Sequence, residues 1–167
     1  MSLNLYGEYT FDSAYYAKKL IAIGIQKPFY KLDLLPDYID NRFAVRVYDG
    51  NNQIPISNKK GYYVIYKRNL LVDYEKAIYA GITKDSLSKR LWRFGIELCD
   101  MPELVRSSGD HPGGRKYRKM GGTRDNLYLK YVLMEEIPFE IPTKHIDSLD
   151  ENLAHLLNTL CNTKRKF

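Results

Sequence analysis

The sequence predicts an α+β fold, within the broad α/β class, in which a small three-stranded antiparallel sheet is flanked by helices. Runs of aromatic and β-branched residues at 61–68, 76–82 and 126–137 have the composition of strands. Apolar residues recur at helical spacing in 85–98 and 150–162. The order strand, strand, helix, basic insertion, strand, helix is typical of a small sheet covered by helices.

The first two strands are expected to pair with each other. Alternation along GYYVIYKR, residues 61–68, places Tyr63 and Lys67 on one face of the sheet. NLLVDYE then provides a turn or connector, and KAIYAGI at 76–82 returns antiparallel to the first strand. The third strand, 126–137, comes after the basic insertion.

Both predicted helices carry an apolar stripe beside a polar one. In the first helix, which Thr83, Asp85 or Ser86 can cap, the apolar stripe consists of Leu87, Leu91, Phe94 and Leu98, and the polar stripe of Arg90, Arg93 and Glu97. In the second, with Asp150 as its cap, the apolar stripe consists of Leu153, Leu156, Leu157 and Leu160, and the polar stripe of Glu151, His155, Asn158 and Asn162. Arg90 and Glu151 therefore lie beside buried stripes.

The chain is expected to divide near residue 58. Residues 1–58 are interpreted as an N-terminal arm or small subdomain, and residues 59–167 as the main domain, with a basic insertion at 106–125. A helical turn is expected at 102–106, and RKYRKMGG within the insertion could form a short helix that its glycines end.

Within the N-terminal part, one helix and one strand can be predicted. Residues 12–24 have the pattern of a short helix, capped by Asp12 or Ser13 and ended by Gly24. FAVRVYD at 43–49 alternates like a strand.

Composition limits the class of protein. Hydrophobic residues make up 44% of the 167 residues, which excludes a disordered chain. The net charge is +6, split as +2 in residues 1–60 and +4 in 61–167, so a polyanionic partner would be held by local clusters. Two cysteines without metal-ligand spacing predict reduced thiols. With neither a signal peptide nor an apolar run of membrane-spanning length, a soluble cytoplasmic protein is expected.

Three separated segments resemble the GIY-YIG endonucleases. GYY at 61–63 and YAG at 79–81 resemble the two tripeptides that name the family, and Arg90 matches the arginine of the following helix. Glu151 and Asn162, eleven positions apart, match the glutamate and asparagine of the family's last helix. One tripeptide has little meaning in a chain with 15 tyrosines, but the joint match over about 58–163 is far more specific.

The resemblance implies a metal-dependent enzyme that hydrolyses phosphodiester bonds of double-stranded DNA. In it, Tyr63 would activate or position the attacking water, Tyr79 would bind phosphate or water, and Arg90 would hold the scissile phosphate. Glu151 would hold one Mg²⁺ (or Mn²⁺) ion. Gly81 would allow close approach of the backbone, and Asn162 would brace the site. The compact length is closest to small phage or restriction-type members, which often dimerise to cut both strands.

Two departures from the family pattern bear on the mechanism. Ile82 stands where members often have lysine, and Phe94 where many have a histidine one turn after the arginine. Without that histidine, Tyr63 is expected to activate the attacking water. Lys67 is the candidate cation that would lower the pKa of the Tyr63 hydroxyl.

The basic insertion is expected to hold the DNA backbone. HPGGRKYRKMGGTRDNLYLK contains many more basic than acidic residues, and cations release counterions when they contact phosphates. The candidate DNA-binding residues are Arg93, Arg115, Lys116, Tyr117, Arg118, Lys119 and Arg124. The alternative is a solvated surface loop.

Plainer interpretations stand beside the enzymatic one. The tyrosines could be core residues, Arg90 could lie on a solvated helix face, and Glu151 could serve the N-terminus of its helix. At the level of the protein, the alternatives are a non-catalytic DNA-binding module on a decayed nuclease fold and an unrelated interaction protein with a tyrosine-rich sheet. The last alternative predicts that Tyr63, Arg90 and Glu151 lie far apart.

Overall fold

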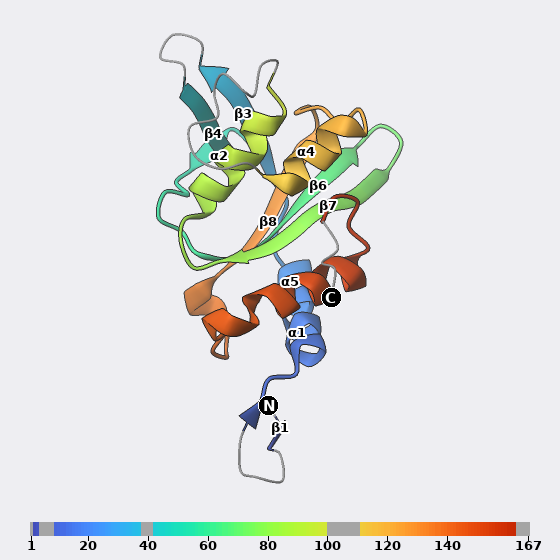
Figure 1. Ribbon diagram of the computed structural model, residues 1–167. Helices are drawn as coiled ribbons and strands as arrows, with labels where there is room; N and C mark the ends of the chain where they lie inside the picture. The colour runs from blue at the N-terminus through green and yellow to red at the C-terminus, as the bar shows by residue number, and fades with distance from the viewer. Residues whose placement is uncertain (1, 4–8, 38–41, 100–110, 163–167) are drawn as a thin grey trace.

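The computed structural model describes residues 2–3, 9–37, 42–99 and 111–162 (Figure 1). The strands are β1 (Ser2–Leu3), β2 (Tyr9–Thr10), β3 (Tyr30–Asp37), β4 (Arg42–Asp49), β5 (Asn52–Ile54), β6 (Gly61–Asn69), β7 (Tyr74–Thr83) and β8 (Leu127–Leu133). The helices are α1 (Ser13–Ile25), α2 (Leu87–Glu97), α4 (Pro112–Lys119) and α5 (Ile146–Leu157), with 3₁₀ turns η1 (Met134–Glu136) and η2 (Thr143–His145). The turn expected at 102–106 lies outside the described residues.

The main sheet is larger than the sequence predicted. It has six strands in the order β5-β4-β3-β8-β6-β7, and every pairing in it is antiparallel. The expectation of three strands is therefore wrong, although the three predicted strands form one end of the sheet. The sheet is extended by β3, which pairs with β8 over Tyr30–Leu32 and brings β4 and β5 with it. A separate pair, β1–β2, lies outside it.

Helices cover both faces of the sheet (Figure 1). On one face, α2 and α4 pack over a core that includes Leu91, Phe94 and Tyr117. On the other, α1 and α5 contact each other over a second core that contains Tyr62 and Leu153. Among the described residues, no helix is long and apolar enough to cross a lipid bilayer.

Side-chain caps fix where two helices begin. The Asp12 carboxylate accepts from the Tyr15 N–H and the Ser86 hydroxyl from the Lys89 N–H, as their sequence positions predicted. Gly24, in contrast, does not end α1, which continues to Ile25. A side chain at Gly24 would meet the buried Tyr62 ring at 2.8 Å, so this glycine serves packing and not termination.

The last helix differs from its predicted bounds. It starts at Ile146, four residues before the expected cap, and ends at Leu157, where Asn158 takes a left-handed φ of 53°. Leu156 is 41% exposed and so does not belong to the buried stripe. Glu151 lies in the second turn of the helix, which excludes the interpretation that it serves the helix N-terminus.

The basic insertion contains a helix that packs on the core. His111 caps α4 and Pro112 occupies its first position, where a missing N–H costs nothing. Gly121, with a φ of +83°, ends it in a Schellman motif, in which the Gly122 N–H donates to the Tyr117 carbonyl. Residues 112–119 are therefore a fixed part of the fold and not a solvated loop.

Candidate active site

A pocket of about 120 Å³ lies at the edge of the sheet, beside β7. Its lining consists of Tyr79 from β7, Pro112 and Gly113 from α4, Asp147, Asp150, Glu151 and Ala154 from α5, and Asn162. The chain after α5 passes along this edge, and the Leu160 and Cys161 N–H groups donate to carbonyls of β7. The pocket therefore lies where α4, on one face of the sheet, meets α5, on the other.

A bulge in β7 sets the direction of the Tyr79 side chain. Tyr79 pairs with Ile65 but the next pair is Ala77–Tyr66, so Ile78 is an extra residue in β7. Bulges of this kind redirect side chains and are frequent beside active sites. Ile78 and Tyr79 consequently both pack against the core under α2 and α4.

Two glycines make room for the two site tyrosines. The Tyr63 ring lies over Gly81, where an added Cβ would come within 3.2 Å of the tyrosine hydroxyl. The Tyr79 ring lies against Gly113, where an added Cβ would come within 2.6 Å. The ring centroids of Tyr63 and Tyr79 are 6.1 Å apart, and each hydroxyl affects the pKa of the other. The close approach expected at Gly81 is thus made by a tyrosine ring.

Both tyrosines remain protonated at neutral pH. Burial raises the pKa of Tyr63 well above its usual value, and Tyr79 and Asp150 raise it further. Burial also raises the pKa of Tyr79 to about 12. The Arg90 charge opposes both shifts without reversing them. The hydroxyls are therefore donors in this form of the protein, which suits positioning of water or phosphate better than proton abstraction.

Arg90 provides a positive charge close to these hydroxyls. It lies on the exposed surface of α2, and its charge lowers the pKa of Tyr63, of Tyr79 and of His111. An exposed guanidinium beside a pocket can bind a phosphate in two-point contact. The predicted polar stripe is not solvated along its whole length, since Arg93 is half-buried and Glu97 is fully buried, whereas Arg90 is exposed.

The α5 side of the pocket is acidic. Asp150 accepts a hydrogen bond from the Ile82 N–H at 3.1 Å, which ties α5 to β7. Glu151 has one carboxylate oxygen, Oε1, that is buried and has no hydrogen-bond partner among the described residues. A buried carboxylate oxygen without a partner is costly unless a ligand pairs with it.

The donor set fits a weakly anchored hard cation. No group of three or more His, Cys, Asp or Glu side chains in the described part of the chain is placed to hold a metal ion. Magnesium retains most of its waters and binds through one or two carboxylates plus substrate phosphates, so a site built around Glu151 suits it.

Asn162 braces the site from beyond the end of α5. Its side-chain oxygen accepts from the Ala80 N–H at 2.9 Å, and its amide donates to the Ala80 carbonyl at 2.8 Å. The amide thus pairs with β7 as a neighbouring strand would. The eleven residues from Glu151 to Asn162 comprise the rest of α5 and the irregular segment that follows it, and both side chains line one pocket.

Lys67 is not part of this site. It lies four residues further along β6 than Tyr63, roughly 13 Å at the rise of a strand, and its ammonium group donates to the Asp125 carbonyl at 2.7 Å. The prediction that Lys67 lowers the pKa of Tyr63 is wrong, because that pKa is raised and the cation that acts on it is Arg90.

His111 is a site residue that the sequence did not reveal. It is 5% exposed, and its ring lies 4.7 Å from that of Tyr79 and 5.3 Å from that of Phe94. Burial lowers its pKa to about 4, helped by Arg90 and Arg93, so it is neutral at pH 7. Nδ1 accepts from the Gly114 N–H, which leaves the proton on Nε2. His111 therefore packs against Tyr79, and its lowered pKa makes it a weak base.

The residues that depart from the family pattern have packing roles. Phe94 is fully buried and contacts the rings of Tyr79, His111 and Tyr117. Ile82 is buried in the core under α1 and α5. His111 had one usable signal in the sequence, since a polar residue before Pro-Gly is typical of a helix start. Asp150 was recognised only as a cap.

The predicted DNA-binding residues differ in accessibility. Lys116 and Lys119 are exposed, and Arg115, Arg118 and Arg124 are half-buried. Tyr117 is 6% exposed and packs in the core beside Phe94, so the prediction that it contacts DNA is wrong. Arg93 is half-buried, and its Nε is buried without a hydrogen-bond partner among the described residues.

Compared with known proteins, the chain matches no family model, no curated protein and no solved structure. The resemblance to GIY-YIG nucleases therefore rests on the residues described above and on their arrangement.

Proposed function

We propose that the protein is a metal-dependent endonuclease that hydrolyses phosphodiester bonds of double-stranded DNA. The observation that carries the proposal is the convergence of three distant segments on one pocket. Tyr79, Glu151 and Asn162 line it, and Tyr63 and Arg90 act electrostatically on its tyrosine. Such convergence is expected of a site and not of core tyrosines scattered by chance.

Each of the candidate site residues has a defined task in this proposal. The exposed Arg90 guanidinium holds the scissile phosphate and stabilises its transition-state charge. The protonated Tyr79 hydroxyl, which lines the pocket, orients the attacking water or the phosphate by donating a hydrogen bond, and the buried Tyr63 hydroxyl positions Tyr79 from behind. Glu151, through Oε1, holds a Mg²⁺ (or Mn²⁺) ion, which when bound polarises the phosphate and stabilises the leaving oxygen.

A plasmid cleavage assay tests the proposal. Supercoiled plasmid should be nicked or linearised by the protein with magnesium and left intact with a chelator. Glu151→Gln keeps the shape of the side chain but removes its charge, and should lower the rate roughly 100-fold or more. Glu135→Gln, at an exposed glutamate of η1, is the matched control and should cut like the wild type.

A non-catalytic DNA-binding module is the second candidate. It is favoured by one observation, the raised pKa of Tyr63 and Tyr79, which leaves neither hydroxyl as a base at neutral pH. In the same assay this module would retard plasmid in a gel without cutting it under either condition. A protein that neither binds nor cuts plasmid would contradict both candidates.

A further inference from the structure

The tip of the β6–β7 hairpin presents apolar side chains to solvent. Leu70, Leu71 and Val72 are 66%, 95% and 69% exposed. Tyr74, at the start of β7, and Met120, at the end of α4, are also exposed, by 48% and 53%. Large apolar side chains that are gathered on one exposed turn often contact another molecule.

The tip is held in a defined shape. The Asn69 side chain accepts from the Leu71 N–H at 3.1 Å, and Asp73 has a left-handed φ of 52°. Asn and Asp side chains of this kind stabilise turns by local hydrogen bonds and tolerate that conformation. The apolar side chains are thus presented by a fixed turn at the end of two paired strands.

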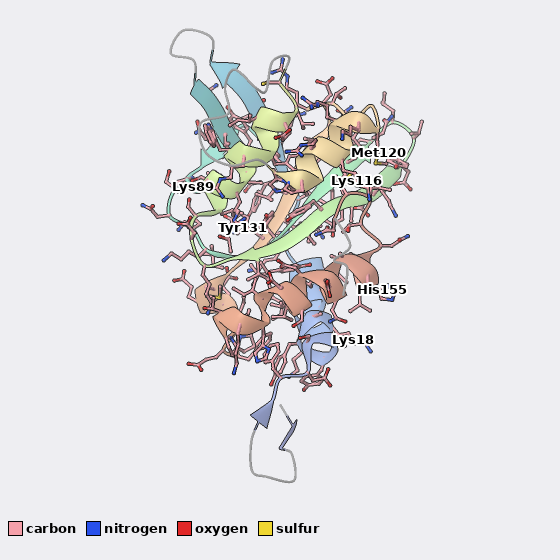
Figure 2. The ribbon with its side chains drawn as sticks, viewed as in Figure 1. Lys18, Lys89, Lys116, Met120, Tyr131 and His155 are labelled. Carbon is pink, nitrogen blue, oxygen red and sulfur yellow. The ribbon has the colours of Figure 1, made fainter. Side chains whose placement is uncertain are left out.

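Basic residues surround the tip. The C-terminal end of α4 lies beside the hairpin, because Tyr74 acts electrostatically on Tyr117. Figure 2 shows Lys116 and Met120 on the same side of the molecule as the hairpin. Residues 67–76 and 116–125 carry seven Lys/Arg and three Asp/Glu, so they hold +4 of the chain's net +6.

The apolar tip and the basic residues around it are complementary to a DNA groove, which combines stacked bases with anionic phosphates. The stacked faces of the bases are apolar, the base edges on the floor of the groove carry hydrogen-bond donors and acceptors, and the phosphates at its walls are anionic. Leucine, methionine and similar side chains that enter a groove can separate two stacked base pairs. A second copy of this chain would meet the same basic residues and be repelled by them.

We propose that the tip of the β6–β7 hairpin enters a groove of duplex DNA and partly unstacks one base step, while Lys116 and Lys119 contact the flanking phosphates. The inference rests on the proposed function, since it concerns the same DNA. Tyr74, the first residue of β7 after the tip, lies five residues from Tyr79, roughly 16 Å at the rise of a strand, so the tip contacts DNA away from the phosphate in the pocket.

Plasmid unwinding tests this insertion without knowledge of a recognition sequence. A nicked plasmid is sealed by ligase in the presence of the full-length Glu151→Gln protein, which keeps the tip but lacks the glutamate charge. Unstacking unwinds the duplex, so the sealed plasmid should carry a changed linking number. The double variant Leu71→Ser/Val72→Ser in the same background should bind plasmid but lose this change.

Two controls separate insertion from other effects. Leu156→Ser, at an exposed leucine of α5 that lies away from the tip, should keep the change in linking number. Lys116→Gln/Lys119→Gln should reduce the slope of log affinity against log salt by about two, whereas the tip variant should leave that slope unchanged. Thermal unfolding of the tip variant should match the parent, since both leucine and valine are exposed.

Each remaining outcome overturns the proposal. Binding of the intact tip without a change in linking number excludes insertion, even where wild-type protein cuts plasmid. Failure to bind plasmid at all excludes insertion and the proposed function together. A tip variant that changes from dimer to monomer in sedimentation, with linking number unaffected, would make the tip a self-association surface.

Discussion

The buried His111 ring makes the stability of the site dependent on pH. In the unfolded chain it titrates near 6.5, but burial, with Arg90 and Arg93 nearby, lowers its folded pKa to about 4. Between these values only the unfolded chain takes up the proton, so stability is full above pH 6.5 and is lost as pH falls toward 4. The loss amounts to about 3 kcal/mol.

His111→Asn should remove this dependence while keeping the helix cap, because asparagine is a favoured N-cap residue. Urea unfolding at pH 7 and at pH 4.5 measures how much the free energy of unfolding changes with pH. The wild type should lose about 2–3 kcal/mol more than the variant between the two conditions. Equal losses in both proteins would contradict the assigned neutral state.

The Tyr79 hydroxyl is the donor within the pocket itself. Tyr79→Phe removes it and retains the ring that packs on Phe94 and His111. Loss of one positioned donor should slow plasmid cleavage about 100-fold, with little change in melting temperature. Tyr131→Phe, on a half-buried tyrosine of β8, should leave the rate unchanged. Equal rates for both variants would mean that Tyr79 has only a packing role.

Residue spacing predicted some of these groups and not others. Tyr63, Tyr79, Arg90 and Glu151 could be proposed because each belongs to a motif on a periodic element. His111 could not, since its place depends on the packing of α4 over Tyr79. Lys67 was misplaced because the strand continues away from the pocket, which no local pattern reveals.

At the scale of elements, α1 depends on a close contact with the sheet. Gly24→Ala should raise helix propensity by up to about 1 kcal/mol, yet its Cβ would meet the Tyr62 ring at 2.8 Å. Tyr62 is 2% exposed, and the cavity that it lines with Gly24 has a volume of only about 10 Å³, so the ring would have to shift against packed neighbours. We therefore expect a net loss of about 1–3 kcal/mol in the free energy of unfolding.

Ala22→Gly, at an exposed position of the same helix, gives the propensity effect alone and should cost about 1 kcal/mol. Urea unfolding of the two variants beside the wild type makes the comparison. A stabilised Gly24→Ala protein would show that the ring can shift.

Helix and strand types followed from the sequence more closely than their ends did. α2 and its Ser86 cap agree with the predicted pattern, because apolar periodicity and a capping serine coincide there. The start of α5 at Ile146 was missed because His145, which precedes it, makes no side-chain cap, and because Asp150, the expected cap, instead accepts from the Ile82 N–H in β7. Tertiary contacts, and not a local capping signal, therefore determine where α5 begins.

At the scale of the whole molecule, the sheet joins parts of the chain that are distant in sequence. β3 pairs with β8, and α1 packs against α5. A fragment of residues 59–167 lacks both β3 and α1, so it would expose an edge of β8 and one face of the second core. We expect this fragment to lack a cooperative unfolding transition in urea, which the full chain should show.

Circular dichroism and hydrogen exchange of the fragment are the measurements. A fragment with native-like protection in β6 and β7 would instead establish residues 59–167 as an independent unit. The sequence could not reveal the β3–β8 pairing, because strand partners separated by so many residues leave no local signature.

The segment after α5 affects how the molecule behaves toward others of its kind. β7 is the last strand of the sheet, and an open last strand can recruit a strand from another molecule and start aggregation. Leu160, Cys161 and the Asn162 amide occupy its hydrogen-bonding groups from Ala77 to Ala80. The same asparagine that shapes the pocket therefore also protects this end of the sheet from intermolecular strand pairing.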